Sequence, residues 1–336
     1  MTPARDSDAP PAEAHSRRRR LLAALAIGLL AAGLCELVTL LPGPGASDFR
    51  DPWLGARALL AGDDPYAAVR AMHPQFGLYY PLTALLAILP LAALSLVHAQ
   101  SLFVGLGMAA LAYALGGWSP MVIGCVGAGA LACVVSGQWG PALTAAARLP
   151  LLGFLWAAKP SIGLALMAGY PRRRALIGAA ALSGLSLIVW PAWPAAWLPG
   201  LGDGVHRVPV GQTGGVLLLL ALLRWRRPEA RMLAVLACLP QSLTLYETVP
   251  LCLIPASRGE AYLLTALSQL AALLMGLQRT DLPLIETQSN QWPILFLGVY
   301  LPALVMVLRR PNEAGRIVTP AHERLVELTP ADRPAA

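Results

Sequence analysis

The stretch from Arg17 to Leu41 reads RRRRLLAALAIGLLAAGLCELVTLL, in which four arginines precede a long apolar run. A helix of roughly 20 apolar residues crosses the hydrocarbon core of a bilayer, so this run has the length of a transmembrane helix. The apolar part of a secretory signal is shorter, about 7–15 residues. We therefore expect an uncleaved first helix that begins in the cytoplasm. The alternative is a signal that is cleaved near Ala46.

Comparable apolar runs recur through the rest of the chain. Of the 336 residues, 57% are hydrophobic and 13% are charged, and the mean hydropathy is +0.60. Soluble domains carry about 25% charged residues, so a soluble protein is excluded. The sequence predicts an all-α, polytopic integral membrane protein with about 10–12 transmembrane helices. After the first helix, the expected spans are 81–97, 99–117, 119–136, 140–157, 160–171, 174–191, 211–224, 230–245, 248–256, 260–278 and 291–308. The runs 160–171, 211–224 and 248–256 are short enough to be half-helices or re-entrant segments.

Arginines account for the net charge of +7, and they gather at the ends of apolar runs. If the twelve runs alternate in direction, four clusters fall on the side of Arg17–Arg20: Arg172–Arg174, Arg224–Arg231, Arg258 and Arg309–Arg316. Positive charge marks the cytoplasmic side of membrane proteins. We expect the plasma membrane of a bacterium, with both termini in the cytoplasm, and no nucleic-acid partner.

These features divide the chain into three regions. Residues 1–16 are expected to be a disordered cytoplasmic tail, 17–310 the transmembrane domain, and 311–336 a second cytoplasmic tail. The segment 42–80 is the longest polar stretch between apolar runs and would form the first loop outside the membrane. Within it, Trp53, Ala56, Leu59 and Leu60 recur at helical spacing. That spacing predicts a short amphipathic helix on the membrane surface.

Two acidic residues follow the first helix directly. Asp48 and Asp51 lie in Ser-Asp-Phe-Arg-Asp. A carboxylate at the membrane–water boundary can act as a general base on a sugar or lipid hydroxyl. The alternative is helix capping, with Ser47 or Asp48 as the N-cap and Asp51 three residues later.

Lys159 is the only lysine in the chain, against 24 arginines. It precedes Pro160, and the span count puts it at the outer end of a helix. A lysine ammonium suits a lipid-borne phosphate as a point-charge partner. The alternative is a side chain that only extends to the interface.

Other polar residues are expected outside the membrane as well. Tyr246 and Glu247 follow a long apolar run, and His206 and Arg207 lie in the loop 192–212 among tryptophans typical of an interfacial belt. The five cysteines form no CxxC pair. Metal-ligand and nucleotide-binding motifs are absent from the sequence, so we expect neither a metal nor another cofactor.

Several stretches, in order, resemble a known enzyme family. They are Ser47-Asp48-Phe49, the run from Ala56 to Tyr66 that ends Gly-Asp-Asp-Pro-Tyr, Tyr79-Tyr80-Pro81-Leu82, Ser136-Gly137-Gln138, Ala158-Lys159-Pro160 and the segment from Pro240 to Tyr246. Together they resemble glycosyltransferase family 87, whose members are polyprenyl-phosphate-mannose-dependent mannosyltransferases of the membrane-bound C-type (GT-C) class.

The resemblance implies a GT-C-like fold and a metal-independent, inverting transfer of a sugar outside the cytoplasm. The partners would be a polyprenyl-phosphate-sugar donor, a lipid or glycan acceptor, and membrane lipids. Asp48 would be the general base, and Lys159 would bind the donor phosphate, with Arg57 and Arg70 as further candidates. The substrate-binding candidates are Asp51, Tyr66, Tyr80, Gln138, His206, Arg207, Tyr246 and Glu247. Two other hypotheses are a transporter or flippase of a lipid-linked or anionic substrate, and an inactive GT-C-like scaffold.

Overall fold

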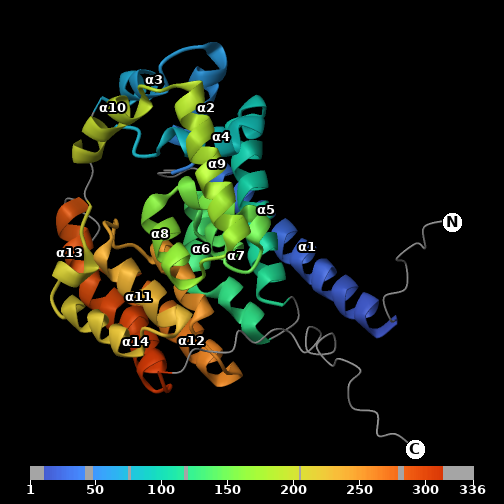
Figure 1. The fold of residues 1–336 in the computed structure, drawn as a ribbon, viewed down its shortest axis with the longest axis vertical. Coiled ribbons are helices and arrows are strands. Elements are labelled where there is room, and N and C mark those ends of the chain that lie inside the picture. The colour runs from blue at the N-terminus through green and yellow to red at the C-terminus, as the bar shows by residue number, and fades with distance from the viewer. Residues whose placement is uncertain are drawn as a thin grey trace, which may run out of the picture.

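The computed structural model describes residues 11–41, 48–74, 77–116, 120–203, 206–278 and 284–312. Within these ranges every regular element is a helix, and the β-type pairing is limited to one antiparallel bridge between Arg207 and Gln241. The prediction of an all-α chain is confirmed. The helices form a bundle from which α1 (Pro11–Leu40) projects at one side (Figure 1).

Several helices of the bundle have the length and apolar character that a bilayer requires. Three qualify within the described residues: Ser16–Leu40, Leu96–Ala114 and Asn290–Leu308. A fourth candidate is a pair, Arg173–Val189 and Trp193–Gly202, bent by 91°. Shorter apolar helices cover Leu82–Ala93, Pro160–Gly169 and Gly215–Arg224. These lengths are those of a membrane protein.

The helix α1 packs antiparallel to α5 (Leu96–Ala114). Gln100 Nε2 lies 3.5 Å from Thr39 Oγ1 at one end of the pair. At the other end Arg20 Nε donates to the Tyr113 carbonyl at 2.5 Å. The start of α5 therefore lies beside the end of α1 that leads to Asp48.

Small residues allow this close packing. A Cβ on Gly28 would lie 2.7 Å from the Gly105 carbonyl oxygen and 2.8 Å from the Ala109 Cβ. Gly28 with Ala32, and Gly105 with Ala109, are small residues four apart on their helices. Such pairs let the backbones of membrane helices approach each other closely.

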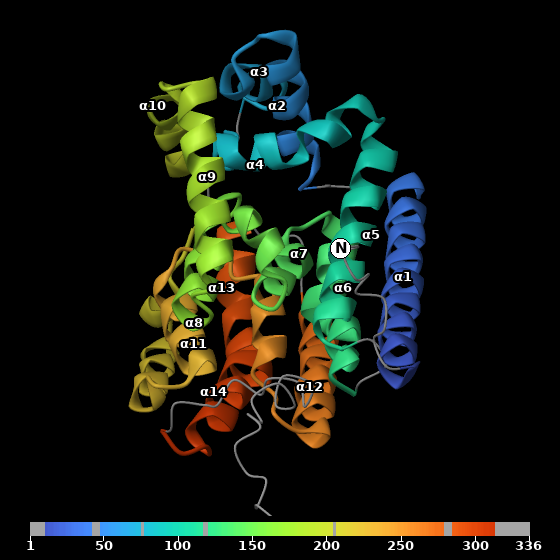
Figure 2. The same cartoon turned by 45° about the vertical axis from the view of Figure 1, so that its right-hand side comes forward.

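One end of the bundle carries the segment that was expected to be an external loop, and we call it the Asp48 end. It holds the short elements α2 (Arg50–Ala61), α3 (Pro65–Met72), α10 (Trp193–Trp197) and η4 (Leu198–Asp203). Figure 2 shows α2, α3 and α10 together at the top, with α4 running across the bundle below them. The short helix expected around Trp53 is present as α2, which buries Ala56 and exposes Leu60.

The expectation that 81–97 runs from one end of the bundle to the other is wrong. This segment forms α4 (Leu82–Ile88) and η1 (Leu89–Ala93), and both pack against α2. Trp53 Nε1 donates to the Leu94 carbonyl at 3.2 Å, so the segment ends where it began, at the Asp48 end. Apolar composition alone does not distinguish a buried helix that crosses from one that lies flat.

The run 140–157 does not traverse the bundle either. It folds into α7 (Gly140–Ala146) and η3 (Pro150–Ala157), and the Trp156 indole donates to the Leu143 carbonyl at 3.0 Å. At its far end, Thr83 Oγ1 of α4 donates to the Ala157 carbonyl at 2.6 Å. The hairpin returns to the level of α4, and residues 138 and 159 lie at its two ends.

The remaining predicted spans correspond to segments that run between the two ends. They are η2 (Pro120–Val126) with α6 (Ala128–Ser136), α8 (Pro160–Gly169), α9 (Arg173–Val189), η6 (Gly215–Arg224) after the short η5 (Pro209–Gly211), α11 (Pro228–Cys238), η7 (Leu245–Leu253), α12 (Arg258–Gly276), and α13 (Leu284–Leu295) continued by η8 (Phe296–Tyr300) and α14 (Leu301–Leu308).

The expected tails are only partly covered by the structure. Residues 11–16, predicted as part of a disordered tail, are the first residues of α1. The helix continues upstream because Ala and Glu are good helix formers. Residues 1–10 and 313–336 lie outside the described residues.

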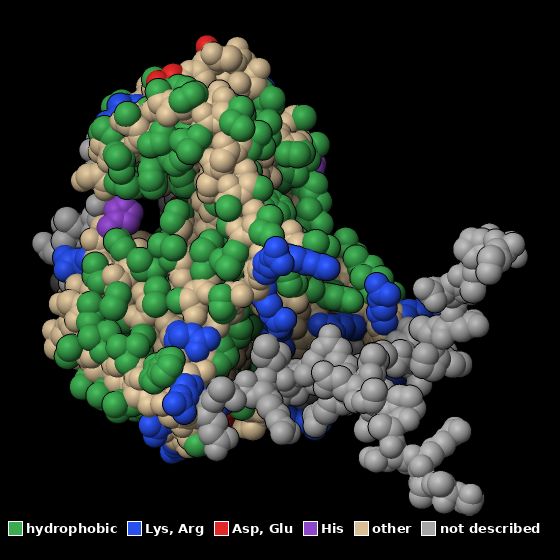
Figure 3. Space-filling view, viewed as in Figure 1, with side chains coloured by type: hydrophobic (Ala, Val, Ile, Leu, Met, Phe, Trp, Pro, Cys, Tyr) green, Lys and Arg blue, Asp and Glu red, His purple; other side chains and the backbone are tan. Residues whose placement is uncertain are grey.

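Arginines join the helices at the opposite end, which we call the arginine end. Arg231 Nε donates to the Ala168 carbonyl at the end of α8, at 2.8 Å. Arg224 Nε donates to the Arg310 carbonyl just after α14, at 2.6 Å. The Arg310 guanidinium in turn contacts the carboxylates of Glu229 and Glu260. Figure 3 shows most Lys and Arg side chains on the lower half of this face and the acidic ones at the top.

Candidate functional site

Asp48 is fixed by the end of α6. Its backbone N–H donates to the Ser136 carbonyl at 2.9 Å. Gly137 then takes the left-handed conformation, with φ of 71°, and a Cβ there would lie 2.9 Å from the Cβ of Phe49. A glycine is needed at this position because positive φ is sterically unfavourable for residues with a Cβ, and that Cβ would also collide with Phe49. The N-cap of α2 is Phe49 without a side-chain bond, so the capping role considered for Asp48 is not seen, and Ser47 lies outside the described residues.

The Asp48 carboxylate turns instead toward Gln138. Gln138 Nε2 donates to Asp48 Oδ2 at 2.6 Å. The amide oxygen of Gln138 accepts from Lys159 Nζ at 3.1 Å and from the Tyr80 hydroxyl at 3.3 Å. These partners orient the amide, since a carboxylate needs the NH₂ group and an ammonium needs the oxygen. Gln138 therefore holds Asp48 and Lys159 on opposite sides of one amide.

Lys159 reaches this point from the start of α8. Pro160 occupies the first helical position, and Lys159 is the residue before it. The ammonium lies 3.5 Å from Glu247 Oε1 and 4.9 Å from the centre of the Tyr246 ring. Its side chain is 14% exposed, so it does not simply extend into solvent. The charge is held by an amide oxygen, a carboxylate and an aromatic face.

Glu247 is the deepest member of the cluster and is 3% exposed. Its Oε2 accepts the Ser242 backbone N–H at 3.0 Å, while Oε1 faces Lys159. The intervening turn contains Leu243, whose φ is 51°, a conformation that a leucine rarely adopts. Such backbone persists only when surrounding contacts hold it. The Glu247 carboxylate provides one of those contacts.

Asp48 differs from Glu247 in accessibility and in the number of its carboxylate oxygens that are engaged. Burial raises the pKa of Asp48 above its usual value, while the Gln138 hydrogen bond and the Lys159 charge act to lower it. Asp48 is half-buried, and the hydrogen bonds of its carboxylate within the described residues involve only Oδ2. Both Glu247 oxygens are engaged. Of the two carboxylates, Asp48 is therefore the one that can accept a proton from an incoming hydroxyl.

Aromatic rings form the wall of the cluster on the side of α5. Phe49 stacks on Phe103 with centroids 4.8 Å apart, and Phe103 meets Trp139 edge-on at 4.8 Å. Tyr80 lies 6.0 Å from Trp139. A low-polarity wall strengthens the electrostatic interactions beside it. We call Asp48, Gln138, Lys159, Glu247 and Tyr80 the polar cluster.

Two of the sequence candidates in α2 have other partners. Asp51 Oδ1 lies 3.6 Å from His73 Nε2, and burial raises the pKa of Asp51 while His73 acts to lower it. The Arg57 guanidinium lies over the Trp53 ring at 4.9 Å. These contacts tie α2 to its surroundings and do not involve the polar cluster.

Arg70 and Tyr66 line a separate cavity of about 260 Å³ between α3 and η4. Asp64, Leu78 and Gly200 also line it. The carboxylate of Asp64 accepts the backbone N–H of Tyr66 at 2.8 Å and so begins α3. Tyr80 belongs to the polar cluster, and Leu78, two residues earlier, faces this cavity. Two extended residues span about 7 Å, so the cavity and the cluster are neighbours.

His206 and Arg207 lie beside the cluster without a hydrogen bond to it. His206 meets Tyr79 edge-on at 5.5 Å, and the Arg207 backbone exchanges two hydrogen bonds of 2.8 Å with Gln241. Gln241 is buried and accepts the Tyr300 hydroxyl at 2.8 Å. Tyr300 was not among the sequence candidates. A tyrosine inside an apolar run was the available signal, because a buried hydroxyl needs a partner.

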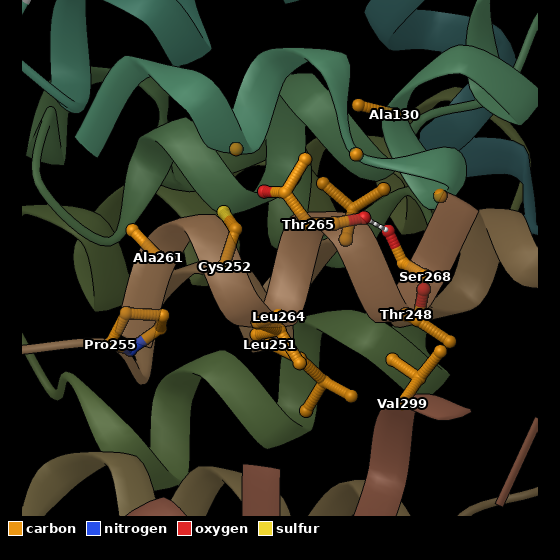
Figure 4. Close-up of a pocket in the computed structure, with 14 residues that line it drawn as sticks. Ala130, Thr248, Leu251, Cys252, Pro255, Ala261, Leu264, Thr265, Ser268 and Val299 are labelled. Carbon is orange, nitrogen blue, oxygen red and sulfur yellow. Dashed lines mark hydrogen bonds between the residues drawn. The ribbon is translucent and has the colours of Figure 1, made fainter. Parts of the chain in front are cut away.

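A smaller cavity of about 40 Å³ lies between α6, η7 and α12 (Figure 4). Thr248, Thr265 and Ser268 line it, and Ser268 Oγ donates to the Thr265 carbonyl at 2.7 Å. Thr248 Oγ1 donates to the Leu245 carbonyl at 2.7 Å. Thr265 Oγ1 donates to the Ile123 carbonyl at 3.4 Å, so the hydroxyl protons of all three side chains are engaged by backbone carbonyls.

Metal-ligand clusters of three or more His, Cys, Asp or Glu side chains do not occur in the described part of the chain. Comparisons of the chain with protein-family models, curated proteins and solved structures find no match.

Proposed function

We propose that this chain is a membrane glycosyltransferase that moves a sugar from a polyprenyl-phosphate donor to a lipid or glycan hydroxyl. The resemblance of the sequence to glycosyltransferase family 87 suggests that the sugar is mannose. The observation that supports sugar transfer is the polar cluster. Three residues from distant segments, Asp48, Gln138 and Lys159, place a half-buried carboxylate and a single ammonium on opposite sides of one amide. Transfer from a lipid phosphate needs a base at the acceptor and a positive charge at the leaving group.

Each member of the cluster has a role in this proposal. Asp48 accepts the proton of the acceptor hydroxyl as its oxygen attacks the anomeric carbon. The bond from that carbon to the phosphate oxygen breaks on the opposite face, its electron pair stays on the phosphate, and the configuration inverts. Lys159 compensates the charge that develops there, and Gln138 keeps both groups in position.

The same proposal includes an orientation in the membrane. The Asp48 end faces away from the cytoplasm and the arginine end faces it, as the positive-inside rule requires. Of the twelve spans expected from the sequence, 81–97 and 140–157 do not traverse the bundle, which leaves ten. An even number keeps both ends of the chain in the cytoplasm, in the plasma membrane of a bacterium.

The test uses purified protein in lipid nanodiscs with labelled polyprenyl-phosphate-mannose and an extract of cell-envelope lipids. We expect a labelled lipid or glycan product from the wild type. Asp48→Asn should bind the donor and transfer at least about 100-fold more slowly, because general-base catalysis contributes roughly 10²–10⁴-fold. Glu36→Gln, which neutralises a carboxylate of α1 outside the cluster, is the matched control and should transfer normally.

Near-normal transfer by Asp48→Asn would remove Asp48 from the role of base. If mannose, glucose and arabinose donors on the same lipid phosphate all give no product with the wild type, the enzyme proposal fails. Movement of the lipid-linked sugar across a proteoliposome membrane would then identify a transporter or flippase. If neither transfer nor transport is detected, the inactive GT-C-like scaffold is the remaining hypothesis.

A further inference from the structure

The polar cluster contains more negative than positive formal charge, which opposes the binding of an anion. Asp48 and Glu247 carry one negative charge each when ionised, against the single positive charge of Lys159. Within the described residues the ion pair of Lys159 is with Glu247. With both carboxylates ionised, a phosphate that approaches Lys159 meets a site with a formal charge of −1. An enzyme that only needed to capture a phosphate would gain affinity by omitting the second carboxylate.

Glu247 cannot be explained as a second general base. It is buried, both its oxygens are occupied, and Gln138 and Lys159 separate it from Asp48. A purely structural role in the 242–247 turn accounts for Oε2, which accepts the Ser242 N–H. It does not account for Oε1 at 3.5 Å from the ammonium. An amide could fill the Oε2 role equally well.

The reaction proposed above changes the charge on the phosphate. The donor is a phosphodiester with one negative charge. After the sugar leaves, the lipid phosphate is a monoester whose second pKa is near 6, so it carries close to two negative charges at neutral pH. A lone lysine would therefore bind the product more tightly than the donor. Slow release of such a product commonly limits turnover.

We propose that Glu247 is a counter-charge to Lys159 that selects against the dianionic product and so promotes its release. The inference rests on the proposed function. Repulsion between Glu247 and a phosphate on Lys159 scales with the phosphate charge, so it weakens the monoester about twice as much, in free energy, as the diester. Glu247 is thus a residue that sets specificity between substrate and product, acting through Lys159.

Binding measurements on the purified full chain test this directly. The probes are a short-chain polyprenyl phosphate monoester and its methyl diester at pH 7.5, titrated by calorimetry. We expect Glu247→Gln to bind the monoester about tenfold more tightly than the wild type, and the diester about threefold more tightly. Lys159→Met should weaken both ligands. Glu36→Gln, the matched control carboxylate, should leave both affinities unchanged.

A steady-state measurement complements the binding data. Inhibition of transfer by added monoester should become about tenfold stronger in Glu247→Gln, because the product then stays on Lys159. Glu247→Asp keeps the charge but draws it back by one methylene, and we expect a smaller change in the same direction. This second variant keeps a carboxylate, so it separates the effect of the position of the charge from the effect of removing it.

The two proposals fail in different ways. Equal effects of Glu247→Gln on monoester and diester, or weaker binding of both by folded protein, would overturn the counter-charge role while transfer by the wild type stands. If the wild type binds neither lipid phosphate and transfers no sugar, the proposed function fails and this inference fails with it.

Discussion

Gln138 connects the two charged groups of the polar cluster through one side chain. Its NH₂ group lies 2.6 Å from Asp48 Oδ2 and its oxygen 3.1 Å from Lys159 Nζ. Hydrogen bonds to charged groups are worth about 1.5–3 kcal/mol each. A change at this one position therefore alters both the proton affinity of Asp48 and the placement of Lys159.

The pH dependence of transfer should report this connection. Burial raises the pKa of Asp48 and the Gln138 bond opposes that rise, so Gln138→Leu should raise it further. A general base works when it is deprotonated. With Asp48 as the proposed base, we expect activity to be lost as the pH falls through the pKa of Asp48, and in the variant this loss should begin at a higher pH. A profile of kcat/KM against pH measures it.

A control for this prediction is Gln269→Leu, because Gln269 lies on α12 and bonds to the Val126 carbonyl, away from the cluster. Its acid limb should coincide with that of the wild type. An acid limb in Gln138→Leu that is unchanged, or that moves to lower pH, would contradict the assignment of Asp48 as the titrating base.

Gly137 determines where Asp48 lies. Gly137→Ala places a Cβ in the left-handed region and 2.9 Å from Phe49 Cβ. The conformational cost alone is about 1–2 kcal/mol. We expect a lower thermal unfolding midpoint in detergent together with reduced transfer. Gly33→Ala is the matched control, since a Cβ there meets nothing within 4 Å; its midpoint should hold or rise slightly. Equal midpoints for the two variants would refute the steric argument.

Among the elements, the pair α1–α5 depends on its small residues. Gly28→Ile should force the helices apart, because even a Cβ would lie 2.7 Å from the Gly105 carbonyl. Overpacking of this kind costs about 1–3 kcal/mol. Unfolding followed by intrinsic fluorescence should show the loss. Gly33→Ile, on the exposed face of the same helix, should be close to neutral. A similar loss in both variants would mean that helix propensity, not packing, is responsible.

The elements also show what apolar patterning does and does not predict. The first helix, α5 and the helix ending near Leu308 were expected from their length and composition. The hairpin of α7 and η3 was not, since its sequence is as apolar as that of a crossing helix. Its return depends on packing, such as the Trp156 indole on the Leu143 carbonyl. The contact of Lys159 with Glu247 joins segments that no local pattern relates.

For the whole molecule, the arginine clusters predicted a common end although two of the twelve expected spans do not cross. The two errors cancel for every residue after 159, so the later arginines are unaffected. For residues 98–139, which lie between these two segments, the twelve-span count predicts the wrong end of the bundle. The twelve-span count puts Gln138 at the arginine end, whereas the structure places it beside Asp48. The same count puts His98, between the runs 81–97 and 99–117, at the arginine end, whereas it too lies at the Asp48 end.

Cysteine labelling in intact cells would test this orientation. In a chain whose five cysteines are replaced by alanine, His98→Cys and Asp63→Cys should react with a membrane-impermeant maleimide added outside. Arg174→Cys should react only after the cells are opened. All three positions are exposed. Protection of His98→Cys in intact cells would restore the twelve-span topology and would separate Gln138 from Asp48 across the membrane.

The arginines of the arginine end that donate to backbone carbonyls suggest a reason why the chain has 24 arginines and a single lysine. Arg231 contacts carbonyls at the end of α8 and also those of Trp225 and Arg226. A guanidinium fork can serve several fixed acceptors at once, whereas an ammonium is a compact point charge. Replacing these arginines by lysines would keep the positive charge at this end but remove several of the hydrogen bonds that join the helices. Arginine therefore supplies the carbonyl contacts that join these helices, whereas the single lysine, Lys159, lies in the polar cluster against Glu247 and Gln138.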